Sequence, residues 1–148
     1  VTGGGIEVHA DGGTVPIVGV FNGCRYTDPT TGKETFSNFY PASTAAADIE
    51  AFVIDDPMVI FEIQAAIAMP VADLLGNFDI VYTTAGSTVT GISGAELQVT
   101  DGGTGTTLPL KAIDISRDPE NSDVGSAHTN VHVVICNHIF GVKGAGLA

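Results

Sequence analysis

The feature that most constrains the fold of this chain is a long β-hairpin pattern between Pro16 and Pro41. Apolar residues of the first arm occupy even positions, with Phe21 out of step; they are Val18, Val20, Cys24 and Tyr26. Such alternation indicates a strand with one buried face. The segment also holds five of the ten aromatic residues of the chain, including Phe36 and Phe39 in the second arm. We therefore expect the hairpin to seed the core of an all-β domain.

The two arms of the hairpin are joined by the turn sequence Asp28-Pro29-Thr30-Thr31-Gly32-Lys33. An aspartate accepts backbone N–H bonds, a proline fixes φ near the turn value, and a glycine permits positive φ. The same Asp-Pro pair recurs at Asp56 and at Asp118. We interpret all three pairs as turns.

The remainder of the chain has the pattern of short strands separated by turns. The strands expected after the hairpin cover Ala51–Ile54, Met58–Gln64, Phe78–Tyr82, Ala95–Val99, Leu108–Ile115 and Thr129–His138, with a further segment around Val89 and Ile92. In Met58–Gln64, the wholly apolar set Val59, Phe61 and Ile63 should face the core. The best helical candidate is Val71–Gly76, with Gly76 as its C-terminal stop.

This organisation predicts one all-β domain, a barrel or a sandwich of about eight to ten short antiparallel strands with at most one short helix. We divide the chain into a Gly-rich arm at 1–15, a β domain at 16–140 and a Gly-rich tail at 141–148. The arm contains one alternating stretch, Ile6–His9, which could form a short strand. Because the chain begins at Val1 rather than Met, an initiator or a longer leader could precede it.

The charge balance and the short apolar runs each argue against one class of partner. The chain carries 17 acidic and 5 basic residues, for a formal net charge of −12. A nucleic-acid partner is not expected, because phosphate contacts need clustered Lys and Arg. No apolar run reaches the length of about 18 residues that a spanning helix needs, so no membrane partner is expected. The acidic residues are scattered, which is typical of a solvated surface and could also suit a basic patch on a partner.

The two cysteines, Cys24 and Cys136, both fall in expected strands. We expect them to be reduced and buried. The alternative is a disulfide between them, if their strands are neighbours. On the last strand, His132, Cys136 and His138 share a face by period two, with His128 just before. Such a face could bind zinc. The alternative, which we favour, places Cys136 in the core and the histidines at the strand ends.

No pattern indicates catalysis. Neither cysteine lies at a helix start or in a Gly-rich elbow, where a nucleophile would be activated. The acidic pairs Asp55-Asp56 and Asp114 with Asp118 are better explained as turn caps than as glycosidase carboxylates. No calcium-loop spacing surrounds Asp101 or Asp123. We therefore expect neither an enzyme nor a cofactor or metal site.

Several of these segments resemble a group of small structural proteins of tailed phages, particularly of marine and cyanophage types, which accompany the major capsid protein. The segments that carry the resemblance are Gly19–Tyr26, Asp28–Lys33, Ser37–Pro41, Asp55–Ala65 and Asn130–His138. The resemblance extends from about Pro16 to His138. It implies a capsid decoration (cement) protein, without catalysis, on the exterior of the virion head and often a dimer or trimer, made in the host cytoplasm.

The expected partners are thus the major capsid protein and other copies of this chain. The N-terminal arm could order on the partner or simply fray. The candidate partner-binding residues are Val1, Thr2, Gly3, Gly4, Gly5 and Ile6. The alternative is a virion adhesin or carbohydrate-binding β-domain. That alternative predicts an exposed aromatic or Asp/Asn cluster in a loop, near Tyr82 or at Asn121–Asp123.

Overall fold

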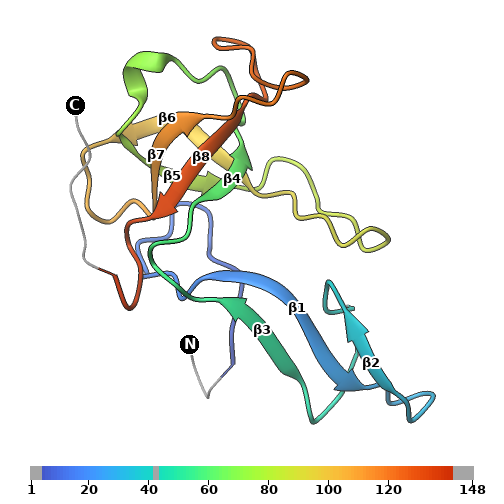
Figure 1. The fold of residues 1–148 in the computed structure, drawn as a ribbon. Helices are drawn as coiled ribbons and strands as arrows, with labels where there is room; N and C mark the ends of the chain where they lie inside the picture. Colours follow the sequence, from blue (N-terminus) through green and yellow to red (C-terminus); the bar gives the residue numbers. More distant parts are fainter. Residues whose placement is uncertain (1–4, 42–43, 142–148) are drawn as a thin grey trace.

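The computed structural model describes residues 5–41 and 44–141, which form an almost entirely β structure (Figure 1). Within these residues, eight strands make two antiparallel sheets, which confirms the expected all-β class. The smaller sheet has the order β2-β1-β3, with β1 Val20–Thr27, β2 Glu34–Ser37 and β3 Glu50–Ile54. The larger sheet has the order β4-β8-β7-β5-β6, with β4 Phe61–Gln64, β5 Asn77–Val81, β6 Glu96–Gly103, β7 Leu110–Ile115 and β8 Asn130–Ile135.

The hydrophobic core belongs to the five-stranded sheet. Along β8, Val131, Val133 and Ile135 are buried, while the residues between them are partly exposed. This alternation follows from the period of two in a strand, which sends successive side chains to opposite faces. The other members of the buried cluster are Ala65, Met69, Phe78, Leu97, Val99, Leu110 and Ala112. Phe61 and Ile63 of β4 pack against this cluster, as their alternation predicts, whereas Val59 precedes β4 and is not part of it.

The five-stranded sheet curls without closing. Its two edge strands, β4 and β6, approach each other where Ala65 and Leu97 form an isolated bridge, and the N–H of Ala66 donates to the carbonyl of Leu97. One bridge is not a ladder, so the described strands do not make a closed barrel. Of the two expected architectures, the structure is consistent with the sandwich-like one. No helix in the described part of the chain is long and apolar enough to cross a membrane.

The predicted hairpin is present as β1 and β2, which pair from Cys24 opposite Ser37 to Thr27 opposite Glu34. Its turn works as the sequence indicates. The Asp28 carboxylate accepts hydrogen bonds from the backbone N–H groups of Thr30 and Thr31, and Gly32 has a positive φ of 67°.

The two other Asp-Pro pairs are also turns. The Asp56 carboxylate accepts a bond from the N–H of Met58, and the Asp118 carboxylate accepts one from the N–H of Glu120. In each case an aspartate bonds the backbone two residues further on, which is the Asx-turn pattern.

The expectation that the hairpin seeds the core is wrong. Figure 1 shows the three-stranded sheet extending away from the five-stranded one, and the core cluster contains no residue of β1 or β2. The Phe36 side chain is 68% exposed. Only a small satellite cluster lies beneath the hairpin, where Cys24 and Tyr26 are buried and the rings of Tyr26 and Tyr40 meet edge to face at 5.7 Å.

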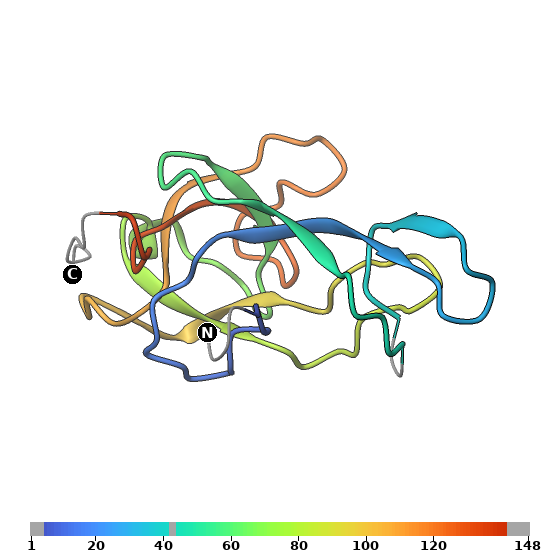
Figure 2. The same ribbon diagram turned by 90° about the horizontal axis from the view of Figure 1, so that it is seen from below.

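The three-stranded sheet is tied to the rest of the molecule at both ends. At one end, the amide of Asn38 donates to the carbonyl of Thr90, in the loop between β5 and β6 that Figure 2 shows running alongside the hairpin. At the other end, the N–H of Ile17 donates to the carbonyl of Asn137, and the N–H of Ile139 donates back to the carbonyl of Ile17. These bonds connect the segment before β1 to the segment after β8.

Two local expectations are corrected. Ile6–His9 forms no strand, and the segment around Val89 and Ile92 is a loop. The helical turn expected at Val71–Gly76 is present as a shorter 3-10 turn, η1 Val71–Asp73.

Gly76 is not the left-handed stop of that helix, because Leu75 takes the positive φ of 69°. The glycine instead allows a close approach to its neighbours. A Cβ at Gly76 would lie 3.0 Å from the carbonyl oxygen of Asp73 and 3.3 Å from the ring of Phe78.

The location of the core gives a prediction for two phenylalanines. Phe78, which is 1% exposed, should lose about 3–5 kcal/mol of unfolding free energy on replacement by alanine, because the change leaves a cavity in the core. The exposed Phe36, changed to alanine, should lose less than about 1 kcal/mol. Urea unfolding of both variants measures the difference, and an equal loss for the two would contradict this location of the core.

Candidate functional site

The strongest candidate site is a hollow on the outer face of the three-stranded sheet. It originates in a bulge of β1, where the pairing with β3 shifts register between Phe21 and Cys24. Gly23 lies inside the bulge with φ of 112°, and a Cβ there would lie 2.8 Å from the carbonyl oxygen of Ser37. A larger residue would thus be strained in φ and in contact with β2.

The bulge also explains why Phe21 breaks the alternation of the first arm. Phe21 lies opposite Val53, and Cys24 lies opposite Ala51, so two β1 residues three positions apart match two β3 residues two positions apart. Phe21 therefore shares the inner face with Cys24. A glycine inside an alternating run is the sequence signal that could have indicated the bulge.

On the outer face, the side chains of Phe36 from β2 and Phe52 from β3 flank the bulge. Together with the bulge residues they border a hollow of about 300 Å³, lined by Asn22, Gly23, Cys24, Phe36, Ser37, Asn38 and Phe52. Two further apolar side chains of this face, Val20 and Ile54, pair with each other at its end and are also exposed. The face thus leaves several large apolar side chains in contact with water.

A charged triad lies beside the hollow on the same outer face. Arg25, on the middle strand, places one guanidinium nitrogen 2.7 Å from a Glu34 oxygen on β2 and the other 2.9 Å from a Glu50 oxygen on β3. The hydrogen bond to Glu34 and the charge of Glu50 raise the pKa of Arg25. The triad links all three strands and leaves one net negative charge at the surface.

The carboxylate of Asp48 holds β1 to the segment before β3. The hydroxyl and the backbone N–H of Thr27 both donate to Asp48, at 2.6 and 3.1 Å. These two hydrogen bonds, with a contribution from the charge of Arg25, lower the pKa of Asp48.

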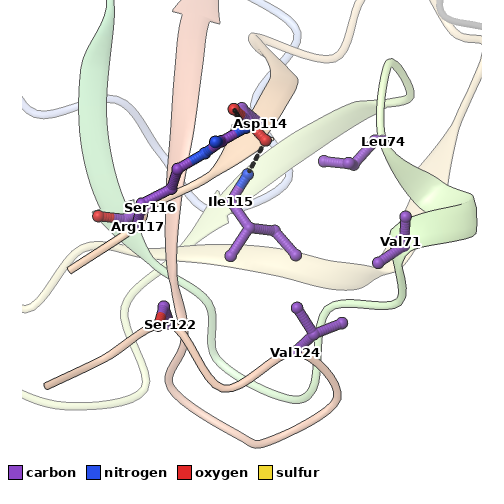
Figure 3. A pocket seen from close by; sticks show the side chains of 8 residues that line it. All are labelled: Val71, Leu74, Asp114, Ile115, Ser116, Arg117, Ser122 and Val124. Carbon is purple, nitrogen blue, oxygen red and sulfur yellow. Dashed lines mark hydrogen bonds and ion pairs between the residues drawn. The ribbon is translucent and has the colours of Figure 1, made fainter. Parts of the chain in front are cut away.

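A cavity of about 360 Å³ lies between η1 and the segment after β7 (Figure 3). Val71, Leu74, Ile115 and Val124 supply its aliphatic lining, and Figure 3 shows these side chains around one space. Ligand sites also need a few polar groups that converge on the ligand. Here the hydroxyl of Ser116 donates to Glu62 instead, so we do not assign this cavity a function.

A polar cluster on the outer face of the five-stranded sheet contains Ser, Glu and His but lacks the order of a catalytic triad. Glu62 is its centre, because it accepts hydrogen bonds from Ser116 and Asn130 and lies 3.5 Å from His132 Nε2. A nucleophilic triad needs the hydroxyl bonded to the histidine and the histidine oriented by the acid. In this cluster the hydroxyl bonds the acid directly, an arrangement that joins three strand segments without activating the serine.

The structure separates the residues of the possible zinc face. His132 faces Glu62, whereas Cys136 and His138 follow the end of β8 and are both buried. His128 lies 3.6 Å from Glu96, in a different part of the sheet. Among the described residues no group of three or more potential ligands is placed to hold a metal ion.

The two cysteines are buried and free; Cys24 lies on β1, and Cys136 directly follows β8 of the other sheet. The Cys24 sulfur donates to the carbonyl of Phe39, and the Cys136 sulfur donates to that of Leu108. Burial raises the pKa of both thiols, which is the opposite of what a nucleophilic cysteine needs.

Of the two loop sites that the adhesin alternative predicts, Tyr82 is exposed, as expected, whereas Asn121 and the Asp123 carbonyl are engaged within the molecule. The Asn121 amide donates to Asn130, and the backbone carbonyl of Asp123 accepts the hydroxyl of Thr129. Of the expected partner-binding arm, Gly5 and Ile6 are exposed, whereas Val1, Thr2, Gly3 and Gly4 lie outside the described residues. The hollow on the three-stranded sheet is a site that the sequence analysis missed.

Comparison of this chain with protein-family models, with curated proteins and with solved structures gives no significant match.

The raised thiol pKa values give a prediction for alkylation. In the folded protein at pH 7.5, Cys24 and Cys136 should react with iodoacetamide at least about tenfold more slowly than a free thiol, because both are buried and protonated. In denaturant both should react at the ordinary rate. A time course followed by mass spectrometry measures both rates. Fast modification of either cysteine in the folded protein would contradict the conclusion that both thiols are buried and protonated.

The lowered pKa of Asp48 gives a prediction for acid. Because the folded-state pKa lies below the unfolded value of about 3.9, the stability that Asp48 provides is present above that value and is lost as the pH falls through the folded pKa. Asp48→Ala should therefore be less stable than the parent protein at pH 7 and equally stable at low acid pH. Thermal melts from pH 7 to pH 2 compare the two, with Asp55→Ala as a control for charge. A difference that persists unchanged at pH 2 would assign the loss to packing instead.

Proposed function

We propose that this chain is a virion structural protein that decorates the head of a tailed phage by binding the lattice of the major capsid protein. The observation that carries the proposal is the outer face of the three-stranded sheet, where Phe36, Phe52 and Ile54 are exposed on a chain with a net charge of −12. Contiguous exposed apolar residues bordered by polar ones mark interaction surfaces. The sequence resemblance supplies the identity of the partner.

The arrangement of the two sheets fits attachment to a repeated surface. The five-stranded sheet has its own core, so the three-stranded sheet can present its outer face without supplying the main core of the fold. A capsid offers many copies of the same site, so modest single contacts give firm attachment when the bound copies also contact each other. This is the role that we propose for self-association as a dimer or trimer on the head exterior.

The alternative function, an adhesin or carbohydrate-binding domain, has two observations in its favour, the exposed Tyr82 and the composition of the hollow. The hollow combines the rings of Phe36 and Phe52 with the side chains of Asn22 and Asn38, and sugars are bound by such combinations of aromatic and amide groups. However, the Asn38 amide already donates to the carbonyl of Thr90. We therefore place this function second.

Co-sedimentation with phage heads that lack this protein tests the proposal. Purified protein should bind the heads and saturate at a fixed ratio to the major capsid protein, because a lattice offers a limited set of equivalent sites. Removal of residues 1–6 should weaken binding if the N-terminal arm takes part. A soluble protein that does not bind the heads would contradict the capsid role, and a glycan screen would then test the alternative.

A further inference from the structure

The hollow over Gly23 is shaped for a side chain of a partner. Its two walls are phenyl rings on separate strands, and the bulge between them has no side chain at Gly23. Phe36, the more exposed of the two rings, belongs to no buried cluster. Its ring can therefore cover an inserted group without disturbing the core. An apolar group that entered the hollow would remove both rings from water, which is the principal driving force for such contacts.

The charges around the hollow indicate which partner would fit. Glu34 and Glu50 lie two residues from Phe36 and Phe52 respectively, on the same outer face of the sheet. Both pair with Arg25, so this triad keeps one net negative charge. Residues 20–56 contain six acidic residues and two basic ones, a difference of −4. A basic partner would be attracted to this rim, because complementary potentials favour the correct encounter. A second copy of this acidic chain would place like charges against each other here.

We propose that the hollow receives one apolar side chain from a partner protein surface that carries Lys or Arg beside that side chain. The inference rests on the proposed function and specifies its contact: the partner surface would be a basic, apolar projection of the capsid lattice. The net negative charge of the rim favours a basic protein partner, and the two rings favour an apolar anchor. Self-association would then use another surface.

Short peptides test this contact on the isolated protein. The probe is acetyl-Lys-Leu-Lys-amide, and the controls are acetyl-Glu-Leu-Glu-amide and acetyl-Lys-Ser-Lys-amide. In ¹H–¹⁵N correlation NMR spectra, the amide signals of Gly23 and Ser37 should shift when the Lys-Leu-Lys peptide is added. The affinity for the acidic peptide should be lower by a factor of about three or more. Added salt should weaken the binding of the Lys-Leu-Lys peptide, because the charges lie at the surface.

Matched variants locate the binding. Phe36→Ser should weaken the Lys-Leu-Lys peptide about tenfold, because it removes one apolar wall of the hollow. Val89→Ser changes a side chain that is 90% exposed and lies outside the hollow, and it should leave binding unchanged. Both variants should keep the parent melting temperature within a few degrees, since neither residue is in the core.

The outcomes separate this inference from the proposed function. If heads bind the parent protein and bind Phe36→Ser equally well, the capsid role stands and the hollow is not its contact. If heads do not bind the parent protein, the peptide spectra still decide whether the hollow takes a basic, apolar group.

Three results in the spectra would overturn the inference. The first is the absence of peptide-induced shifts at Gly23 and Ser37. The second is equal binding of the acidic and basic peptides. The third is movement of these two amides with protein concentration alone, or with a glycan and not with the peptide, which would identify a second copy or a sugar as the occupant.

Discussion

The burial of alternate side chains of β8 is the interaction on which the rest of the structure depends. Val131, Val133 and Ile135 lie on one face of a strand that pairs with both β4 and β7, so their burial fixes the register of three strands at once. A slip of one residue would exchange this apolar face for the polar one that carries His132. Because this sheet holds the core, the outer face of the smaller sheet lies outside the core cluster and exposes Phe36, Phe52 and Ile54.

The strand content and the turns could be predicted from the sequence because they depend on local chemistry. Asp28, Asp56 and Asp118 each bond the backbone two residues ahead, and this requires only an aspartate followed by proline. The sides of β4 were also predicted correctly, since Phe61 and Ile63 face the core. These features are determined within a few residues of sequence.

The position of the core could not be predicted in the same way. The aromatic content suggested that the hairpin forms the core, but Phe36 is exposed. The core is built mostly from aliphatic residues around Phe78, on strands that are distant in sequence. The left-handed residue after η1 is Leu75 rather than Gly76, in a segment that hydrogen-bonds to Ala112 of β7, which is distant in sequence. The hollow was missed for a related reason: Phe36 and Phe52 are brought together only by the pairing of β2 and β3 with β1.

The central claim is that the five-stranded sheet carries the stability of the fold, while the three-stranded sheet presents a surface. Native-state hydrogen exchange of the free protein tests this claim most directly, because it measures the opening free energy of each amide. We predict that amides of β7 and β8 exchange only through global unfolding, and that amides of β2 and β3 exchange through openings of lower free energy. Equal protection of the two sheets would contradict the account.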